Sequence, residues 1–468
     1  MDRKLKGSLS LNILYNLLSV IVPFITAPYL GRVLGVTLVG HYTYVFSIAS
    51  YFVLFGLLGI SNYGTRSIAQ VRENRDKRSQ VFWETYSMQF LTGIASVVFF
   101  LFYILIRNID GRAFFFIMLP FVASSFLEVG WYCSGMEQFR RIVFRNALIK
   151  FLNLVLVLTF VKTPEHLTRY FFIMSSCYFL SSVILWPSIY NEVSPGRLVF
   201  PISKDRFKSN ILLFVPILAT SLYQVMDKIM IGALSNKDQL AFYEYADKII
   251  NIPTLVWGAM GAVMLSRISN LIGKGDQNGS EGLLSESMDL TILIASFFVA
   301  IVGATSDELV RVYYGANFAP SAPILMLLVP VVFLAGWNQV LRMQYIIPND
   351  LNSIYIVSTF LGAGINLILN LLLIPKYGAY GATAGTIAAY FAIALYFYIS
   401  LRRVLPLKSI IKRNIWMLLV AASTVALVRF FRSFHSVGLM ELILDVLCGS
   451  LFFFMIVAIV FRSKRIRI

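Results

Sequence analysis

The feature that most constrains the fold is a set of long apolar runs that recurs along the whole chain of 468 residues. The stretches SVVFFLFYILI (96–106) and LFFFMIVAIV (451–460), for example, are apolar on every face. A run of about 18 apolar residues is typical of a helix that crosses a bilayer, whereas the strands of a membrane barrel alternate apolar and polar residues. The sequence therefore predicts an all-α integral membrane protein with many transmembrane helices.

Turn-forming residues between the runs divide the chain into about fourteen predicted transmembrane helices. An even number of crossings places both termini on the same side of the membrane. The predicted spans are 10–30, 38–60, 84–106, 113–135, 146–162, 169–190, 210–234, 242–266, 287–304, 320–341, 353–375, 381–401, 414–431 and 441–461.

The distribution of basic residues predicts the orientation of these helices. Of the 40 lysine and arginine residues, 28 lie in or beside the loops on the side of the termini and 10 on the opposite side. Cytoplasmic loops of membrane proteins carry such an excess, so both termini are predicted to be cytoplasmic. The same bias accounts for the net charge of +17, and nucleic acid is not expected as a partner.

The side chains that usually carry catalysis are sparse and scattered. Cys133, Cys177 and Cys448 each lie in or beside an apolar run, and their spacing fits no metal site. The sequence contains no Ser/His/Asp set or nucleotide-binding glycine loop, and no loop is long enough for a catalytic domain. We therefore expect neither an enzyme nor a resident cofactor or metal. A passive channel is also disfavoured, because no repeated filter segment is present.

A weak internal repeat suggests two halves. SLSLNILYNLL (8–18) is similar to FKSNILLFVPI (207–217), and GHYTYVFSIASY (40–51) is similar to AFYEYADKIINI (241–252). The sequence thus predicts two six-helix bundles, 1–200 and 205–403, with two further helices in 405–468. Both halves start on the cytoplasmic side, so they are parallel repeats, and transporters of this kind bind substrate between the halves.

Two apolar spans carry the same charged pattern, YQVMDK (223–228) and YEYADK (243–248). An ionised side chain at the centre of a bilayer costs about 2.5–3.5 kcal/mol, so such groups face the protein interior or a hydrated cavity. One interpretation is structural, with Asp227 paired to Lys248 or Asp247 to Lys228. The other is a cavity wall that meets the cargo, with Asp227 or Asp247 carrying a coupling proton or sodium ion. The candidate residues are Tyr223, Asp227, Lys228, Tyr243, Glu244, Asp247 and Lys248.

Other polar residues on or near the spans are further candidates. Glu128, deep in a predicted helix, is either a coupling site or a hydrogen-bonded structural carboxylate. Arg66 and Arg342, near cytoplasmic ends, are either pyrophosphate anchors or ordinary basic flanks. Arg32 lies on the outer side, against the general bias, and Lys150 begins an inward polar face that also suits contacts between helices.

Small and amide side chains predict contacts between two of the later helices. Asn366 and Asn370 lie four residues apart in the span 353–375 and suit hydrogen bonds between helices. Gly381 and Gly385 have the GxxxG spacing of closely packed membrane helices.

Four segments resemble a known family. They are PFITAPYLGRVLG (23–35), GHYTYVFSIASYF (40–52), GISNYGTRSIAQVR (59–72) and LIPKYGAYGATAGT (373–386), and they resemble the polysaccharide or O-antigen flippases of the Wzx type. That family belongs to the superfamily that also includes multidrug/toxin extruders and lipid II flippases. The resemblance covers most of the chain and agrees with the predicted number of helices.

The resemblance implies a function. Such proteins move an undecaprenyl-pyrophosphate-linked oligosaccharide repeat unit from the cytoplasmic to the periplasmic leaflet of the bacterial plasma (inner) membrane. It also implies alternating access, the surrounding membrane lipids as partners, and a polysaccharide polymerase and a chain-length regulator as partner proteins. The last two helices would help to accommodate the isoprenoid tail.

Two other functions remain open at this point. The first is an ion-coupled multidrug extruder of the same superfamily, although extruders of cationic drugs favour acidic cavities and here Lys150, Lys228 and Lys248 accompany the carboxylates. The second is a membrane polysaccharide polymerase or glycosyltransferase. That class usually has a long outer loop or a nucleotide-sugar domain, and neither is evident in the sequence.

Overall fold

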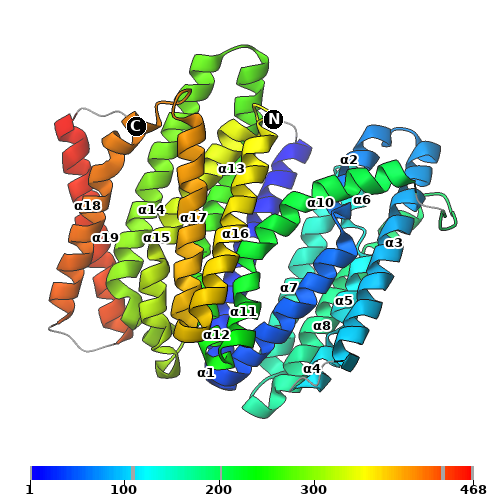
Figure 1. Ribbon diagram of the computed structural model, residues 1–468, viewed down its shortest axis with the longest axis horizontal. Helices are drawn as coiled ribbons and strands as arrows, with labels where there is room; N and C mark the ends of the chain where they lie inside the picture. The colour runs from blue at the N-terminus through cyan, green and yellow to red at the C-terminus, as the bar shows by residue number, and fades with distance from the viewer. Residues whose placement is uncertain (1–2, 107–110, 201–202, 434–437, 465–468) are drawn as a thin grey trace. The chain divides into compact units, whose positions relative to one another are not determined.

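Every secondary-structure element that the structure describes is a helix (Figure 1). The computed structural model describes the backbone of residues 3–106, 111–200, 203–433 and 438–464. Side chains are described from Ile21 onward, except for Tyr223 and Phe461 and for the residues after Arg462.

The chain divides into two compact units, Met1–Ser221 and Leu222–Ile468. The helix α10 belongs almost entirely to the first unit, where Asn210 Nδ2 donates to the carbonyl of Leu58 and Tyr51 donates to the carbonyl of Ser221. The helices of this unit are α1 (Arg3–Leu57), α2 (Ile60–Val71), α3 (Arg75–Ile106), α4 (Arg112–Ile117), α5 (Leu119–Leu127), α6 (Gly130–Gly135), α7 (Phe139–Phe160), the short η1 (Pro164–His166), α8 (Leu167–Val183), α9 (Trp186–Tyr190) and α10 (Lys204–Gln224).

The second unit also contains the segment 405–468, which the sequence analysis set apart as two appended helices. Its elements are α11 (Met226–Leu234), α12 (Lys237–Ile250), α13 (Ile252–Gly273), α14 (Gln277–Tyr313), the short η2 (Ala316–Phe318), α15 (Ser321–Leu341), the π-helical turn η3 (Arg342–Ile346), α16 (Asn352–Tyr377), α17 (Ala379–Leu401), α18 (Leu407–Arg432) and α19 (Leu439–Lys464).

The predicted multi-spanning helical fold is confirmed. Among the described residues, twelve helices are long and apolar enough to cross a membrane, or thirteen if the bent pair Lys204–Leu222 and Met226–Leu234 forms one span. About fourteen transmembrane helices were predicted, because two separate spans were expected within the segment that forms α1.

The kink in α1 accounts for this difference. The candidate span Ile21–Val71 has 51 residues, which in a straight helix would extend about 77 Å, more than twice the roughly 30 Å of a bilayer core. The helix bends at Gly35, where φ is 77° and ψ is 178°, a conformation that glycine tolerates best. In Figure 1 the ribbon of α1 runs away from the N-terminus and returns after this bend, so one assigned helix holds both predicted crossings.

Some predicted boundaries were wrong because spans are broken or extended. The predicted helix 210–234 is split into α10 and α11, and 242–266 is split into α12 and α13, which carries Pro253 in its first turn. Proline is tolerated there because the first amides of a helix have no partner within the helix. The predicted loop 61–83 is largely helical, since it contains α2 and the first turns of α3.

The outer surface of the helices is apolar, as a bilayer requires. On α3, Leu91, Val98, Phe102 and Leu105 are 50%, 55%, 60% and 61% exposed. They recur at intervals of three, four or seven residues, so they form one stripe along the helix. A water-soluble protein rarely exposes such a stripe, whereas lipid chains would cover it.

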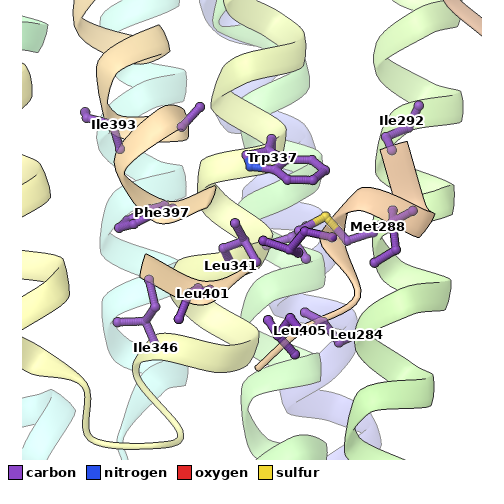
Figure 2. Close-up of a cluster of buried hydrophobic side chains, with 14 of the residues drawn as sticks. Leu284, Met288, Ile292, Trp337, Leu341, Ile346, Ile393, Phe397, Leu401 and Leu405 are labelled. Atoms are coloured by element: carbon purple, nitrogen blue, oxygen red, sulfur yellow. The ribbon is translucent and has the colours of Figure 1, made fainter. Parts of the chain in front are cut away.

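The core of the second unit joins α18 to α14 and α15. Figure 2 shows Leu284, Met288 and Ile292 of α14 facing Trp337 and Leu341 of α15. The same cluster includes buried residues from the start of α18: Leu407, Ile410 and Met417.

Ion pairs fasten both ends of α18 to α14. Near its start, Arg413 Nη2 lies 2.6 Å from Asp289 Oδ2. Near its end, Arg432 contacts Asp307 and Glu308. The helix is therefore an integral part of the second unit.

Candidate functional site

Asp227 is a buried carboxylate held by neutral groups. It lies in the first turn of α11 and is 1% exposed. Its Oδ2 accepts hydrogen bonds from the Tyr243 hydroxyl at 2.8 Å and from Thr386 Oγ1 at 2.6 Å. Its Oδ1 accepts from Asn370 Nδ2 at 2.6 Å. We call Asp227 and these three donors, which come from α12, α17 and α16, the Asp227 cluster.

The helices α16 and α17 pack closely together, which brings Asn370 and Thr386 within reach of Asp227. A Cβ on Gly385 would lie 2.3 Å from Asn370 Oδ1, and one on Gly381 would lie 2.5 Å from the backbone of Leu373. The close packing that the GxxxG spacing predicted is therefore confirmed. Asn370 Nδ2 also donates to Asn366 Oδ1 at 3.1 Å, which leaves Asn370 Oδ1 and Asn366 Nδ2 buried without hydrogen-bond partners.

Lys228, the next residue along the chain, belongs to a different group of contacts. Its Nζ lies 2.7 Å from Glu244 Oε2 and 3.1 Å from Asp247 Oδ2. Lys248 Nζ lies 3.3 Å from Glu244 Oε1 and 4.8 Å from the centroid of the Tyr245 ring. We call Lys228, Glu244, Asp247 and Lys248 the ion-pair cluster. Its two cations balance its two carboxylates.

Helical geometry explains why two adjacent charges reach different partners. Successive residues on a helix point about 100° apart, so Asp227 reaches α16, α17 and the Tyr243 hydroxyl of α12, while Lys228 reaches the carboxylates of α12. Of the two structural pairs considered from the sequence, Asp247 with Lys228 is formed. Within the described part of the chain, Asp227 forms no ion pair.

The Asp227 cluster has the chemistry of a cation site. A buried charge is costly unless an opposite charge compensates it, and among the described residues only hydroxyl and amide dipoles contact this carboxylate. Carboxylate, hydroxyl and amide oxygens are the ligands that small hard cations prefer, and a proton would neutralise the same group.

Arg342 lies in a separate polar pocket of the second unit. It is the first residue of η3, and its guanidinium contacts Gln339 and approaches the Tyr355 ring to 5.6 Å from the centroid. The pocket has a cavity volume of ≈ 130 Å³. Its lining comes from α13, α15, α16 and α17, with Gln224 of α10 at one edge.

Glu128 in the first unit is charge-compensated. Its two carboxylate oxygens lie 2.8 and 2.9 Å from Arg145 Nη1. They also accept from the backbone N–H of Gly130 and from Ser182 Oγ. Arg145 is 8% exposed. Of the two roles considered for Glu128, this geometry fits the structural carboxylate.

A break in the helix positions Glu128, and polar side chains satisfy the freed backbone. The residue is extended (φ −72°, ψ 115°) between α5 and α6. Gln89 Nε2 donates to the carbonyls of Ser125 and Glu128, both at 2.7 Å. Trp186 Nε1 donates to the carbonyl of Leu127 at 2.9 Å. Unpaired backbone groups are not tolerated in lipid, so this break is stable only because of these donors.

The remaining predicted site residues are not members of these clusters. Arg32 and Arg66 are exposed on α1 and α2, and Lys150 is partly buried on α7. All three belong to the first unit. The side chain of Tyr223 lies outside the described residues.

Sequence reasoning missed several members of these sites. Thr386 carries no charge or motif of its own, and only its place directly after Gly385 marks it. Arg145 was counted among the basic flanks, although it is buried against Glu128. Gln89 lies within the predicted span 84–106, and an amide within a membrane span was a usable signal.

A match to a protein-family model shows how this chain is related to known proteins. The model described as "Polysaccharide biosynthesis protein" matches residues 5–271, which is more than half of the chain. The chain belongs to the polysaccharide biosynthesis protein family. A second model, "Lipid II flippase MurJ", matches residues 151–457.

Curated relatives of this family member are distant in sequence, and two of the three described below match over most of both chains. A "Putative O-antigen transporter" of Escherichia coli (strain K12) is 22% identical over 353 residues, 74% of this chain and 85% of the relative. A protein with the same description from Shigella dysenteriae is 23% identical over 77% of this chain and 90% of the relative. A "Probable low-salt glycan biosynthesis flippase Agl15" of Haloferax volcanii is 26% identical over 35% of this chain and 34% of the relative.

Solved structures share the fold. The lipid II flippase MurJ in an inward closed conformation matches with a TM-score of 0.76 and 17% identity, over 98% of this chain and 99% of that one. An inward-facing multidrug resistance transporter of the MATE family, in the MOP superfamily, matches with a TM-score of 0.62 and 12% identity, over 82% of this chain and 95% of that one.

These matches confirm the predicted family and the predicted fold class. The protein is a multi-pass integral membrane protein of a transporter family, not of an enzyme family. The cytoplasmic placement of both termini stays a prediction.

Proposed function

We propose that this protein is a flippase that carries a lipid-linked oligosaccharide across the membrane by alternating access. The observation that carries the proposal is the pair of family matches, one to polysaccharide biosynthesis proteins and one to lipid II flippases. The names of the relatives and the fold shared with MurJ over 98% of the chain support it.

The more specific proposal concerns the cargo and the direction of transport. We propose undecaprenyl-pyrophosphate-linked repeat units of O-antigen or another surface polysaccharide, moved outward across the bacterial plasma membrane. The excess of lysine and arginine on one side supports cytoplasmic termini. A polysaccharide polymerase and a chain-length regulator are the proposed protein partners.

Asp227 is the proposed coupling residue. Its carboxylate is 1% exposed and has no cationic partner among the described residues, so a bound proton or sodium ion would remove a large electrostatic cost. A ligand shifts a conformational equilibrium only by its differential affinity for the two states. Coupling therefore requires that α11, α16 and α17 enclose Asp227 differently in the two states.

The cationic residues are the proposed contacts of the cargo. Lys228 and Lys248 are neutralised by carboxylates in this conformation, and opening of these pairs would free them for a pyrophosphate. The exposed Arg32 and Arg66 and the half-buried Lys150 are proposed contacts along the first unit. Arginine can hold phosphate oxygens with two parallel hydrogen bonds.

Genetic complementation tests this function. The gene is expressed in a strain that lacks its own O-antigen flippase, and surface polysaccharide is measured on gels. We expect restored polysaccharide and no accumulation of lipid-linked repeat units in the cytoplasmic leaflet. Unchanged accumulation with normal expression and membrane insertion would contradict the proposal.

The second candidate function is an ion-coupled multidrug extruder. It is favoured by the MATE-family fold match with a TM-score of 0.62. The same strain, rendered sensitive to cationic drugs, separates the two functions. Raised drug resistance without restored polysaccharide would replace the flippase proposal with this one.

A further inference from the structure

The polar pocket around Arg342 has the size and the lining of a small-molecule site. Its cavity volume of ≈ 130 Å³ corresponds to several water positions at roughly 10–15 Å³ each, which is enough room for a single sugar ring. On α15, Ala335, Asn338, Gln339 and Arg342 line it at helical spacing, so one face of that helix forms a wall. The other lining residues are Gln224, Thr254, Trp257, Tyr355, Ser358, Thr359, Tyr390, Ile393 and Phe397.

The charge of this pocket has one sign. Among the described residues that line it, Arg342 is the only ionisable one besides the tyrosines, and none is an aspartate or a glutamate. The guanidinium uses one nitrogen on Gln339 and approaches the Tyr355 hydroxyl at 3.5 Å. Its Nε is buried without a hydrogen-bond partner. An arginine with a spare donor and no carboxylate beside it is suited to an anion.

Two further polar groups in the lining are buried without partners. Trp257 is 1% exposed, and its Nε1 has no hydrogen-bond acceptor. Asn338 is 8% exposed, and its Oδ1 has no donor, although its amide nitrogen donates to the carbonyl of Tyr390. Such groups cost about 1–3 kcal/mol each when nothing pairs with them. A ligand with both hydroxyl groups and an acidic oxygen would satisfy all of them together.

Packing holds the Trp257 indole in place. A Cβ on Gly336 would lie 2.9 Å from the indole ring, and a methyl group of Thr291 lies against the same glycine. The ring is therefore fixed before a ligand arrives, which lowers the entropy cost of binding. Aromatic faces beside hydrogen-bonding amides suit the alternating apolar and polar faces of a sugar ring.

We propose that this pocket binds a monosaccharide unit that carries an anionic oxygen group, either a carboxylate or a phosphate, with the anion held by Arg342. The inference rests on the proposed flippase function, because it assigns the pocket to an acidic part of the glycan cargo. The sugar ring lies against Trp257 and Tyr355, and the side-chain oxygen Oδ1 of Asn338 accepts a hydrogen bond from a sugar hydroxyl.

Direct binding to the purified, detergent-solubilised protein tests this inference. Saturation-transfer difference NMR is suited to weak sugar ligands and is run with D-glucuronate, glucose 1-phosphate, D-glucose and inorganic phosphate. We expect binding of glucuronate, glucose 1-phosphate or both, and binding of glucose and inorganic phosphate that is weaker by about tenfold or more. Glucuronate alone would indicate an acidic sugar residue as the source of the anion. Glucose 1-phosphate alone would indicate the sugar phosphate at the lipid end.

Variants locate the binding. Arg342→Met should weaken binding of the acidic sugars by about tenfold or more, and Arg342→Lys, which keeps the charge, should restore part of it. Trp257→Phe keeps a ring but removes the N–H and should weaken binding less. Arg311→Met, in the last turn of α14 and outside the pocket, is the matched control and should bind as the unaltered protein does. Melting temperatures of all variants show that they are folded.

The outcomes are distinct from those of the complementation test. Equal binding of glucose and glucuronate, or acidic-sugar binding that survives Arg342→Met, would overturn the inference even if the gene restores polysaccharide. Absence of binding by all four probes to folded protein would overturn it as well. Acidic-sugar binding in a protein that fails to complement would leave the pocket in place and remove the flippase function.

Discussion

Each unit of this protein contains a carboxylate that lies at a break in an apolar helix, and the two differ in how their charge is compensated. Glu128, between α5 and α6 of the first unit, has Arg145 against both of its oxygens. Asp227, just after the break between α10 and α11, has only hydroxyl and amide donors. Both are carboxylates embedded in apolar spans, and the sequence alone does not tell them apart.

The difference indicates which of the two has a structural role. A carboxylate that is paired with a cationic side chain of its own unit needs no bound ion to compensate its charge. Removal of one partner leaves the other as an unpaired buried charge. A buried carboxylate without a counter-charge is compensated only when a proton or another cation binds to it. Its charge therefore depends on a ligand. We therefore expect changes at Glu128 to affect stability and changes at Asp227 to affect transport.

The largest expected effect is on transport. Asp227→Asn keeps the size of the side chain and removes its charge, and we expect surface polysaccharide to fall to the level of the flippase-null strain. Stability should be unchanged or slightly higher, because a desolvated charge is lost. Polysaccharide in complemented cells and melting temperature of the purified protein are the measurements.

Asp76→Asn is the control for that experiment, since Asp76 is exposed in the first turn of α3. Full polysaccharide in the Asp227→Asn strain would remove the distinction between the two carboxylates.

The next effect is on stability in the first unit. Glu128→Gln leaves the Arg145 guanidinium, 8% exposed, without its counter-charge, and we expect a loss of about 3 kcal/mol of unfolding free energy. The double variant Glu128→Gln/Arg145→Met should recover most of this loss, because no charge remains buried. Denaturation of the purified protein in detergent measures both. A stable single variant that fails to transport would move the coupling role to Glu128.

A smaller effect is expected from the amide that supports the break at Glu128. Gln89, 0% exposed, donates to two carbonyls and accepts from Trp131 Nε1 at 2.8 Å. Gln89→Leu leaves these groups unpaired and should cost about 1–3 kcal/mol. Transport per folded molecule should be retained. Loss of transport at unchanged stability would show that the break itself moves during the cycle.

The smallest effect is expected at Lys248 in the ion-pair cluster of the second unit. The Lys248 side chain is 38% exposed and contacts Glu244 one helical turn away, so Lys248→Ala should cost only about 0.3–0.5 kcal/mol. The Lys228 side chain is 18% exposed and contacts two carboxylates, so Lys228→Met should destabilise the protein more. Thermal melts of the two variants, side by side, test this order, and equal losses would contradict it.

Much of the architecture was predictable because a bilayer requires each spanning segment, taken by itself, to be long and apolar. Length and hydropathy identified the spans, and the exposed stripe on α3 that includes Leu91 and Phe102 is of the kind those spans require. Boundaries failed where a span is broken, as at Glu128, or where a kink at Gly35 joins two spans into one helix. Broken spans depend on donors such as Gln89 from another helix, which no local pattern reveals.

The sequence by itself determined that this is a helical membrane protein of a flippase-like family. It also determined that the charged groups within its spans need partners, because the cost of a charge in lipid follows from the type of residue and its depth. Only the tertiary structure decided which partner each group has. Asp227 and Lys228 are neighbours in the chain, yet one faces Thr386 and the other Glu244. That choice depends on helix rotation and on contacts between residues far apart in sequence, and hydrogen bonds and ion pairs form only where those helices meet.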